Sequence, residues 1–182
     1  MKFLATNLPG VVVIEPRTFV DERGWFMESF NQRCFSKGLQ DLGIPAPESF
    51  VQDNQSCSKK GVLRGLHYQR EPHAQGKLVS VTRGAAFDVA VDLRSTSATY
   101  GKWFALELNA RNKKMLWIPE GFAHGFLALE DETCVNYKTT RYYNKEAECS
   151  VFWKDQLLGI KWPRLERYLL SDKDKNAPCL SS

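Results

Sequence analysis

Residues 61–84 read GVLRGLHYQREPHAQGKLVSVTRG, and they hold most of the side chains in this 182-residue chain that are suited to chemistry. Two of the three histidines, His67 and His73, lie there, as does Lys77 at the start of an apolar run. The third histidine, His124, lies in a second compact segment, WIPEGFAHGF. We therefore expect the functional site to be built from these two segments.

The length and composition predict one soluble domain, residues 1–182. The chain is 43% hydrophobic and 25% charged, which is ordinary for a globular protein. The net charge of +4 is spread as lysine pairs and not as basic runs. We therefore expect no nucleic-acid partner, although an anionic small molecule would be favoured.

Cysteine usage and the apolar runs limit the compartment. Five cysteines form no CxxC motif, and an odd number argues against a disulfide framework or a structural zinc site. No apolar run approaches the roughly 18 residues of a membrane span, and the start of the chain does not read as a signal peptide. The expectation is a cytoplasmic protein without a membrane partner.

Hydrophobic periodicity predicts an all-β fold with a few short helices. Apolar residues alternate with polar or small ones over residues 87–93, 104–109 and 133–139, and turn-forming clusters separate these runs. Short intervals of this kind are typical of a sandwich or barrel. The absence of a GxGxxG motif argues against a dinucleotide-binding fold.

Other segments give local expectations. The first residues read as an exposed start before a strand at residues 11–14, and an aromatic strand follows a turn at residues 21–24. Asn31 is a candidate cap for a short helix that Gly43 would end. The chain after Trp153 is expected to form a strand or two and short helical turns packed on the barrel.

Two spacings resemble the two motifs of the cupin superfamily, a small double-stranded β-helix, or jelly-roll, barrel. Five residues separate Gly61 from His67, and residues 119–124 follow the pattern PxGxxH. Metal-binding cupins continue the first motif with a second histidine and an acidic ligand. Here Gln69 and Lys77 occupy those places, and neither an amide nor an ammonium replaces such ligands well. We therefore expect no metal and no redox cofactor.

An imidazole and a fixed positive charge on neighbouring strands suit proton abstraction beside a carbonyl group. Histidine titrates near neutrality and can take the proton. A lysine at the carbonyl oxygen would stabilise the developing enolate. We expect His67 to be the only one of the three histidines with a carboxylate partner.

Several longer segments together resemble one family, the dTDP-4-dehydrorhamnose 3,5-epimerases. They are DERGWFMESF, FVQDNQSCSKKGVLRGLHYQ, AQGKLV, FDVAVDLR, WIPEGFAHGF, YKTTRYY and LSDKD, and the match covers residues 9–178. The resemblance implies a metal-free cupin that inverts C3 and C5 of dTDP-4-dehydro-6-deoxyglucose in the dTDP-L-rhamnose pathway. It also implies a homodimer, in which residues 21–30 would join the partner's sheet and site.

The resemblance assigns catalytic roles to four residues. His67 is the general base, and Asp174 orients it as the second member of a dyad. Tyr137 is the general acid on the other face of the sugar, and Lys77 supports the enolate. The resemblance implies a further set of substrate contacts. Those to the nucleotide are Arg23, Glu28, Gln52, Asn54 and Tyr143, which stacks on the thymine; those to the diphosphate or sugar are Arg64, His124, Glu148 and Lys173.

Each assignment has a plainer alternative. Ser171 and Asp174 read equally as the cap of a short helix. Arg23 could be a solvated turn residue, Tyr142 is the neighbour most easily confused with Tyr143, and His73 reads as exposed loop. The alternative functions are a single-site epimerase or ketoisomerase on another deoxysugar, a metal-dependent cupin dioxygenase, and a sugar-binding barrel without activity.

Overall fold

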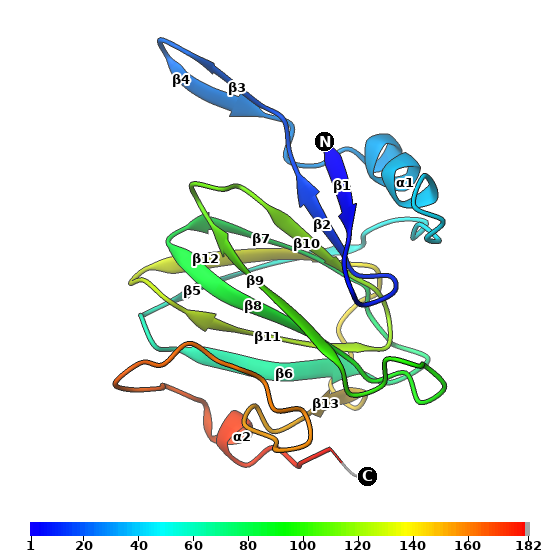
Figure 1. Ribbon diagram of the computed structural model, residues 1–182, viewed down its shortest axis with the longest axis vertical. Coiled ribbons are helices and arrows are strands. Elements are labelled where there is room, and N and C mark those ends of the chain that lie inside the picture. Colours follow the sequence, from blue (N-terminus) through cyan, green and yellow to red (C-terminus); the bar gives the residue numbers. More distant parts are fainter. Residues whose placement is uncertain (181–182) are drawn as a thin grey trace.

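The computed structural model describes residues 1–180, which form two facing β-sheets and a projecting hairpin (Figure 1). The elements, in chain order, are β1 Lys2–Ala5, β2 Val12–Glu15, β3 Thr18–Asp21, β4 Gly24–Met27, α1 Gln32–Gln40, β5 Gln52–Ser58, β6 Leu63–Gln69, β7 Lys77–Arg83, β8 Ala85–Asp92, β9 Trp103–Asn109, β10 Met115–Ile118, β11 Phe122–Ala128, β12 Thr133–Thr139, β13 Glu148–Ser150 and α2 Asp172–Lys175.

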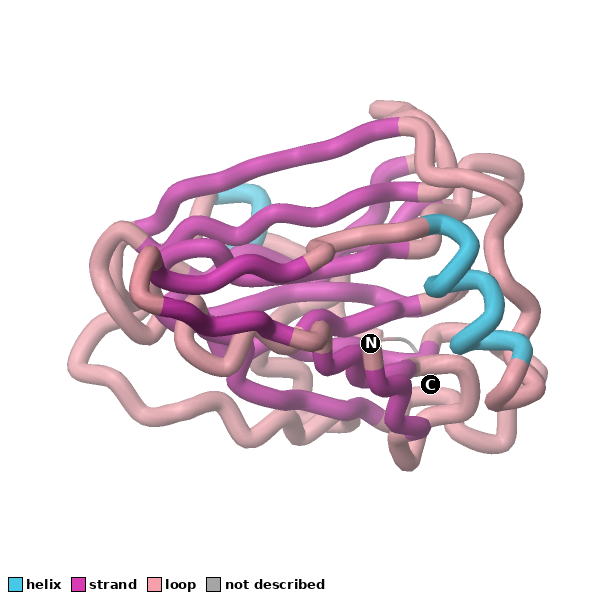
Figure 2. The backbone as a smooth tube through the Cα atoms, turned by 90° about the horizontal axis from the view of Figure 1, so that it is seen from above, coloured by secondary structure: helices cyan, strands magenta, loops and turns pink. Residues whose placement is uncertain are grey.

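The sheets have the crossed connections of a jelly roll. One sheet has the order β1-β2-β10-β7-β12-β5 and the other β13-β6-β11-β8-β9. Neighbouring strands in both sheets run antiparallel. Strands form the centre of the body, and the two helices of residues 1–180 lie at its periphery (Figure 2). The predicted all-β barrel is therefore confirmed.

The main core fills the space between the sheets, as the alternating pattern predicts. Val79, Val135 and Leu116 from the six-stranded sheet meet Ala90 and Phe126 from the five-stranded one. A second cluster lies on the outer face of the five-stranded sheet, where the chain after β13 covers it (Figure 1). Because both of its faces are covered, β8 is almost wholly buried.

Helix α1 covers part of the outer face of the six-stranded sheet. Its cap is Asn31, whose side chain accepts a hydrogen bond from the Cys34 amide, as predicted. Phe35 packs against Trp117 of β10 with ring centroids 5.3 Å apart. Gly38 is required within the helix, because a Cβ atom there would lie 2.3 Å from the Phe3 ring.

Two local expectations were wrong. The first residues, although largely exposed as expected, already form a strand, since β1 pairs with β2 from Lys2 onward. After Trp153 the described residues contain no strand, only an isolated bridge between Val62 and Leu169 and the short α2. This segment is held by side chains packed on the barrel and needs no ladder of its own, so periodicity did not reveal its form.

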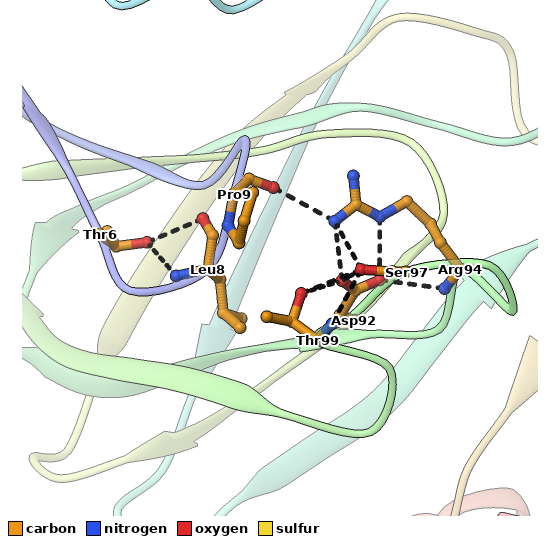
Figure 3. Close-up of polar contacts among 7 residues, drawn as sticks. All are labelled: Thr6, Leu8, Pro9, Asp92, Arg94, Ser97 and Thr99. Carbon is orange, nitrogen blue, oxygen red and sulfur yellow. Dashed lines mark hydrogen bonds and ion pairs between the residues drawn. The ribbon is translucent and has the colours of Figure 1, made fainter.

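A buried carboxylate closes the end of β8 (Figure 3). Asp92 is fully buried and accepts hydrogen bonds from Arg94, Ser97 and Thr99. Burial acts to raise the pKa of Asp92, but these hydrogen bonds outweigh it and lower the pKa well below its usual range. Arg94 also donates to the Pro9 carbonyl, so the network ties the loop after β8 to the turn after β1.

Candidate active site

A cavity of about 790 Å³ lies between the two sheets. Its walls come from β5, β7 and β12 on one side and from β6 and β11 on the other, and the segment around α2 borders it. Of the predicted site residues, it gathers Gln52, Asn54, Arg64, His67, Lys77, His124, Tyr137, Tyr143, Glu148, Lys173 and Asp174. Residues from six separate parts of the sequence therefore share one cavity.

Close approach of β6 and β11 positions the two motif histidines. Gly65 has φ +115°, and a Cβ atom there would lie 2.7 Å from the Gly125 Cα and the His124 carbonyl oxygen. Two glycines therefore allow the strands to meet without side chains between them. Beyond this point His67 and His124 are direct cross-strand partners.

His67 is held by a buried carboxylate. Its Nε2 lies 2.5 Å from Oδ1 of Asp174, which is 3% exposed. Burial acts to raise the pKa of Asp174, but the hydrogen bond and charge of His67 outweigh it and lower that pKa. An ionised carboxylate at Nε2 favours the proton on that nitrogen and leaves Nδ1 with its lone pair. Ser171 caps α2 through the Asp174 amide, so the capping alternative and the pair coexist.

His124 also has a carboxylate partner, so the expectation that only His67 would have one was wrong. Its Nε2 lies 2.9 Å from Oδ2 of Asp88, a fully buried residue of β8. Asp88 Oδ1 has no hydrogen-bond partner among the described residues. The signal was present in FDVAVDLR, where two acidic residues, Asp88 and Asp92, stand in a strand that is otherwise apolar. Periodicity alone does not show that both faces of that strand are covered.

Lys77 is a buried cation near the first histidine. It is 8% exposed, and its Nζ donates to the His67 carbonyl oxygen at 3.3 Å. Burial lowers its pKa to about 8, while the charges of Asp88 and Glu148 act in the opposite direction. Asp88 is therefore a counter-ion to Lys77 that sequence reasoning missed. The lysine keeps a substantial charged fraction at neutral pH despite its burial.

Tyr137 faces the cavity from β12, on the opposite sheet to His67. Burial, with a contribution from the charge of Glu148, raises its pKa, although Arg64 acts to lower it. The hydroxyl is therefore protonated throughout the physiological range and able to donate a proton.

The mouth of the cavity carries a polar cluster. Lys173 lies 2.6 Å from Glu148, and the Tyr143 hydroxyl donates to the same carboxylate at 3.0 Å. Burial acts to raise the pKa of Glu148, but these two hydrogen bonds outweigh it and lower that pKa. Tyr142 does not line the cavity, whereas Tyr143 does. His73 lies outside the lining as well, and its Nε2 is 3.2 Å from the side-chain Nδ2 of Asn144.

Arg23 and Glu28 are not brought to this cavity. Arg23 lies at the tip of the β3–β4 hairpin, where it forms an ion pair with Asp21 and its side chain is 85% exposed. Glu28 follows β4 and accepts a hydrogen bond from Asn31. Figure 1 shows this hairpin extending away from the two sheets. Within one chain, therefore, neither residue can reach the site.

Gln69 and Lys77, which stand where metal-binding cupins have ligands, make other contacts here. The side-chain amide of Gln69 donates to the main-chain carbonyls of His73 and Tyr142 and accepts from the main-chain amide of Asn144. It therefore anchors the loops that carry these three residues. Lys77 contributes a positive charge where a ligand would be negative. Within residues 1–180, no group of three His, Cys, Asp or Glu side chains is arranged to hold a metal ion. The donor set therefore does not fit a metal centre.

Fold and site together define a jelly-roll enzyme equipped for acid–base chemistry: a histidine–carboxylate pair, a facing tyrosine and a buried lysine. The family model described as dTDP-4-dehydrorhamnose 3,5-epimerase matches residues 5–182. The chain belongs to this family and is an isomerase of the dTDP-L-rhamnose pathway.

Three relatives illustrate the similarity. A dTDP-4-dehydrorhamnose 3,5-epimerase from Shigella flexneri is 53% identical over 97% of this chain and 94% of its own. A dTDP-6-deoxy-D-glucose-3,5-epimerase from Legionella pneumophila, crystallised with dTDP-4-keto-L-rhamnose, has TM-score 0.91 and 47% identity over 98% of this chain and 92% of that one. A 3'-monoepimerase from Streptomyces bikiniensis, crystallised with dTDP-quinovose, has TM-score 0.87 and 35% identity over 98% and 87%.

No helix among the described residues is long and apolar enough to cross a membrane.

Proposed function

We propose that this cavity inverts C3 and C5 of dTDP-4-dehydro-6-deoxy-D-glucose and so produces dTDP-4-dehydro-L-rhamnose. Both carbons lie beside the C4 carbonyl, so removing either proton gives an enolate. The observation that carries the proposal is the hydrogen bond between Asp174 and Nε2 of His67, in a cavity that Tyr137 lines from the opposite sheet. Lys77 lines the same cavity and donates to the His67 carbonyl oxygen.

His67 is the general base in this mechanism. Because Nε2 is engaged by Asp174, Nδ1 is the nitrogen that removes the proton. Asp174 holds the ring in one tautomer and stabilises the imidazolium that forms. His124 does not share this arrangement, since its partner Asp88 lies deeper and its side chain is buried. We assign His124 to binding the diphosphate or sugar.

Inversion requires removal of the proton on one face of the ring and its return on the other. His67 comes from the five-stranded sheet and Tyr137 from the six-stranded sheet, so the two groups stand on opposite walls of the cavity. Tyr137 therefore supplies the returning proton. Lys77 meets the negative charge on the C4 oxygen, which imidazole alone is too weak a base to create at a useful rate.

The remaining lining residues bind the nucleotide. Arg64 is a candidate for the diphosphate, and Lys173 becomes one if it leaves Glu148 when substrate enters. Tyr143 is exposed at the mouth, and its ring can stack on the thymine. Gln52 and Asn54 of β5 contact the nucleotide part. The Gln52 side chain lies next to Tyr143, whose main-chain amide donates to it, and it donates in turn to Asn54.

We further propose a homodimer in which the β3–β4 hairpin reaches the partner's cavity with Arg23 and Glu28. The hairpin exposes Trp25 and Phe26 by more than half, which a solitary barrel has little reason to do. A groove of about 640 Å³ beside the hairpin, on the outer face of the six-stranded sheet, offers room for a second chain. Its lining includes Trp25 and Lys138.

We propose a cytoplasmic location, which the odd number of cysteines and the lack of a CxxC motif in the sequence support.

Proton exchange in deuterated water tests the function directly. The expected result is deuterium incorporation at both C3 and C5 of the substrate, unaffected by a metal chelator. Exchange at one carbon only would indicate a single-site epimerase, and binding without exchange would indicate a sugar-binding barrel. Loss of exchange on chelation, with recovery on adding a divalent metal, would favour the metal-dependent alternative.

A further inference from the structure

Two of the five cysteines face each other outside the cavity. Cys57 of β5 and Cys134 of β12 are direct partners in the antiparallel register. On β12, Val135 and Tyr137 point between the sheets, so Cys134 points outward. Cys57 is exposed and Cys134 is half-buried. The pair thus lies on the outer surface of the six-stranded sheet.

The main-chain bonds show which kind of cross-strand pair this is. The Thr139 carbonyl accepts from the Val51 amide on the β5 side, whereas the Thr140 amide donates to Gly76 on the β7 side. Main-chain groups of successive strand residues alternate in direction, and the β5–β12 register is unbroken from 133 to 139. Cys134 therefore directs its main chain toward β7, and its pairing with Cys57 is of the non-hydrogen-bonded kind.

This kind of pair suits a disulfide. Its Cα atoms are about 4.5 Å apart, within the 4.4–6.8 Å that disulfides span. The neighbouring Cys57 thiol, together with burial, raises the pKa of the Cys134 thiol. The Cys134 thiol donates a weak hydrogen bond to the Glu132 carbonyl oxygen at 3.4 Å, which rotation of its side chain toward Cys57 would break. Neither cysteine lies in the lining of the groove proposed for the partner subunit.

We propose that Cys57 and Cys134 form a modification site at which hydrogen peroxide or an organic hydroperoxide generates an intramolecular disulfide. The exposed Cys57 attacks the peroxide oxygen as its thiolate, becomes a sulfenic acid, and the O–O bond breaks to release water or an alcohol. The Cys134 sulfur then attacks the sulfenic sulfur, and the hydroxyl leaves as water with the Cys134 proton. Two electrons pass from the sulfur atoms to the peroxide.

The disulfide would cross-link β5 to β12 in the wall of the active site. β5 is the end strand of its sheet and is hydrogen-bonded there only to β12. It carries Gln52 and Asn54 into the cavity, so loss of its pairing would dismantle the nucleotide-binding wall. A covalent bond between β5 and β12 removes freedom from the unfolded chain and restrains the edge strand in the folded one.

Peroxide treatment of the full-length protein, followed by alkylation and peptide mapping, tests the proposal. The expected product links the peptides of Cys57 and Cys134, is lighter by two hydrogen atoms, and reverts with dithiothreitol. Its Tm should exceed that of the reduced protein by at least about 5 °C, because the cross-link closes a long loop. A Cys34→Ser variant should behave identically, and a Cys57→Ser/Cys134→Ser variant should show no gain in Tm.

Three results would overturn this inference. Both thiols could remain open to alkylation after the exposed Cys34 has been oxidised. Cys57 could be found linked to another cysteine or to a second molecule. The disulfide could also form and leave Tm unchanged, which would refute the claim that the cross-link stabilises the folded protein. In Cys134→Ser, Cys57 should instead be oxidised irreversibly to the sulfinic acid, which mass analysis separates from the disulfide.

Discussion

Replacing Lys77 with methionine should make the protein more stable and far less active. Burial lowers the pKa of this lysine from its ordinary 10.5 to about 8. One pKa unit corresponds to about 1.4 kcal/mol, so carrying the buried charge costs on the order of 3 kcal/mol at neutral pH. Methionine matches the length of the aliphatic stem and removes that cost. A gain in Tm of up to roughly 5–10 °C is expected at pH 7 for a chain of this size.

The same change removes the cation that we propose faces the enolate oxygen. Loss of such a partner typically lowers kcat by about 10²–10³. KM should change far less, because the interaction strengthens only as the negative charge develops. Added divalent metal should not restore kcat.

The pH dependence gives an independent signature of Lys77. The unfolded chain binds the proton up to about pH 10.5, whereas folded Lys77 releases it near pH 8. Between these values the Lys77 contribution makes the free energy of unfolding rise with pH, and this contribution should be absent from Lys77→Met. In the wild type, kcat should fall about tenfold from its plateau by pH 9 as the lysine loses its charge. Tyr137 does not explain such a fall, because its pKa is raised.

Thermal unfolding and deuterium exchange, each measured from pH 7 to pH 10, test both parts. Lys114→Met is the matched control, since it removes a more exposed lysine that pairs with Glu15. A Lys77→Met protein with normal kcat and a large rise in KM would assign the lysine to the diphosphate. A lower Tm would refute the buried-charge argument, and rescue by metal would reopen the metal-dependent mechanism.

Three further predictions concern the base and the dimer. His67→Ala should abolish exchange at both C3 and C5 while circular dichroism stays native; substantial exchange by the folded variant would remove His67 from the base role. Asp174→Asn should lower kcat strongly because the imidazole loses its charged partner, and unchanged activity with weakened α2 would leave only the capping role. Dilution should reduce specific activity in step with dissociation measured by light scattering, and a fully active monomer would contradict the shared site.

The barrel was predictable because its strands alternate clearly, and the place of His67 in the cavity was predictable because a motif surrounds it. The partner of His124 was missed for a physical reason: Asp88 is recognisable as buried only when both faces of β8 are known to be covered. The segment after Trp153 was also misjudged. It is shaped by packing on the outer face of the five-stranded sheet, which leaves no regular period in the sequence.

Local signals and tertiary contacts can coincide in one residue. The cap of α2 and the orientation of His67 both depend on Asp174, the first through its amide and the second through its carboxylate. The local pattern around Ser171 indicated only the cap. The contact with His67 spans 107 residues, and no local pattern contains it.

The projecting β3–β4 hairpin has a genetic consequence in the proposed homodimer. Each chain would lend its hairpin to the other's cavity, so a damaged Arg23 would silence the neighbour and spare the chain that carries it. Mixed dimers of an Arg23-defective chain and a His67-defective chain would then hold one intact site, and random mixing would restore about a quarter of normal activity. A hairpin mutant produced beside the normal protein would not lower the total activity, because each normal hairpin still completes one site, on either a normal or a mutant chain.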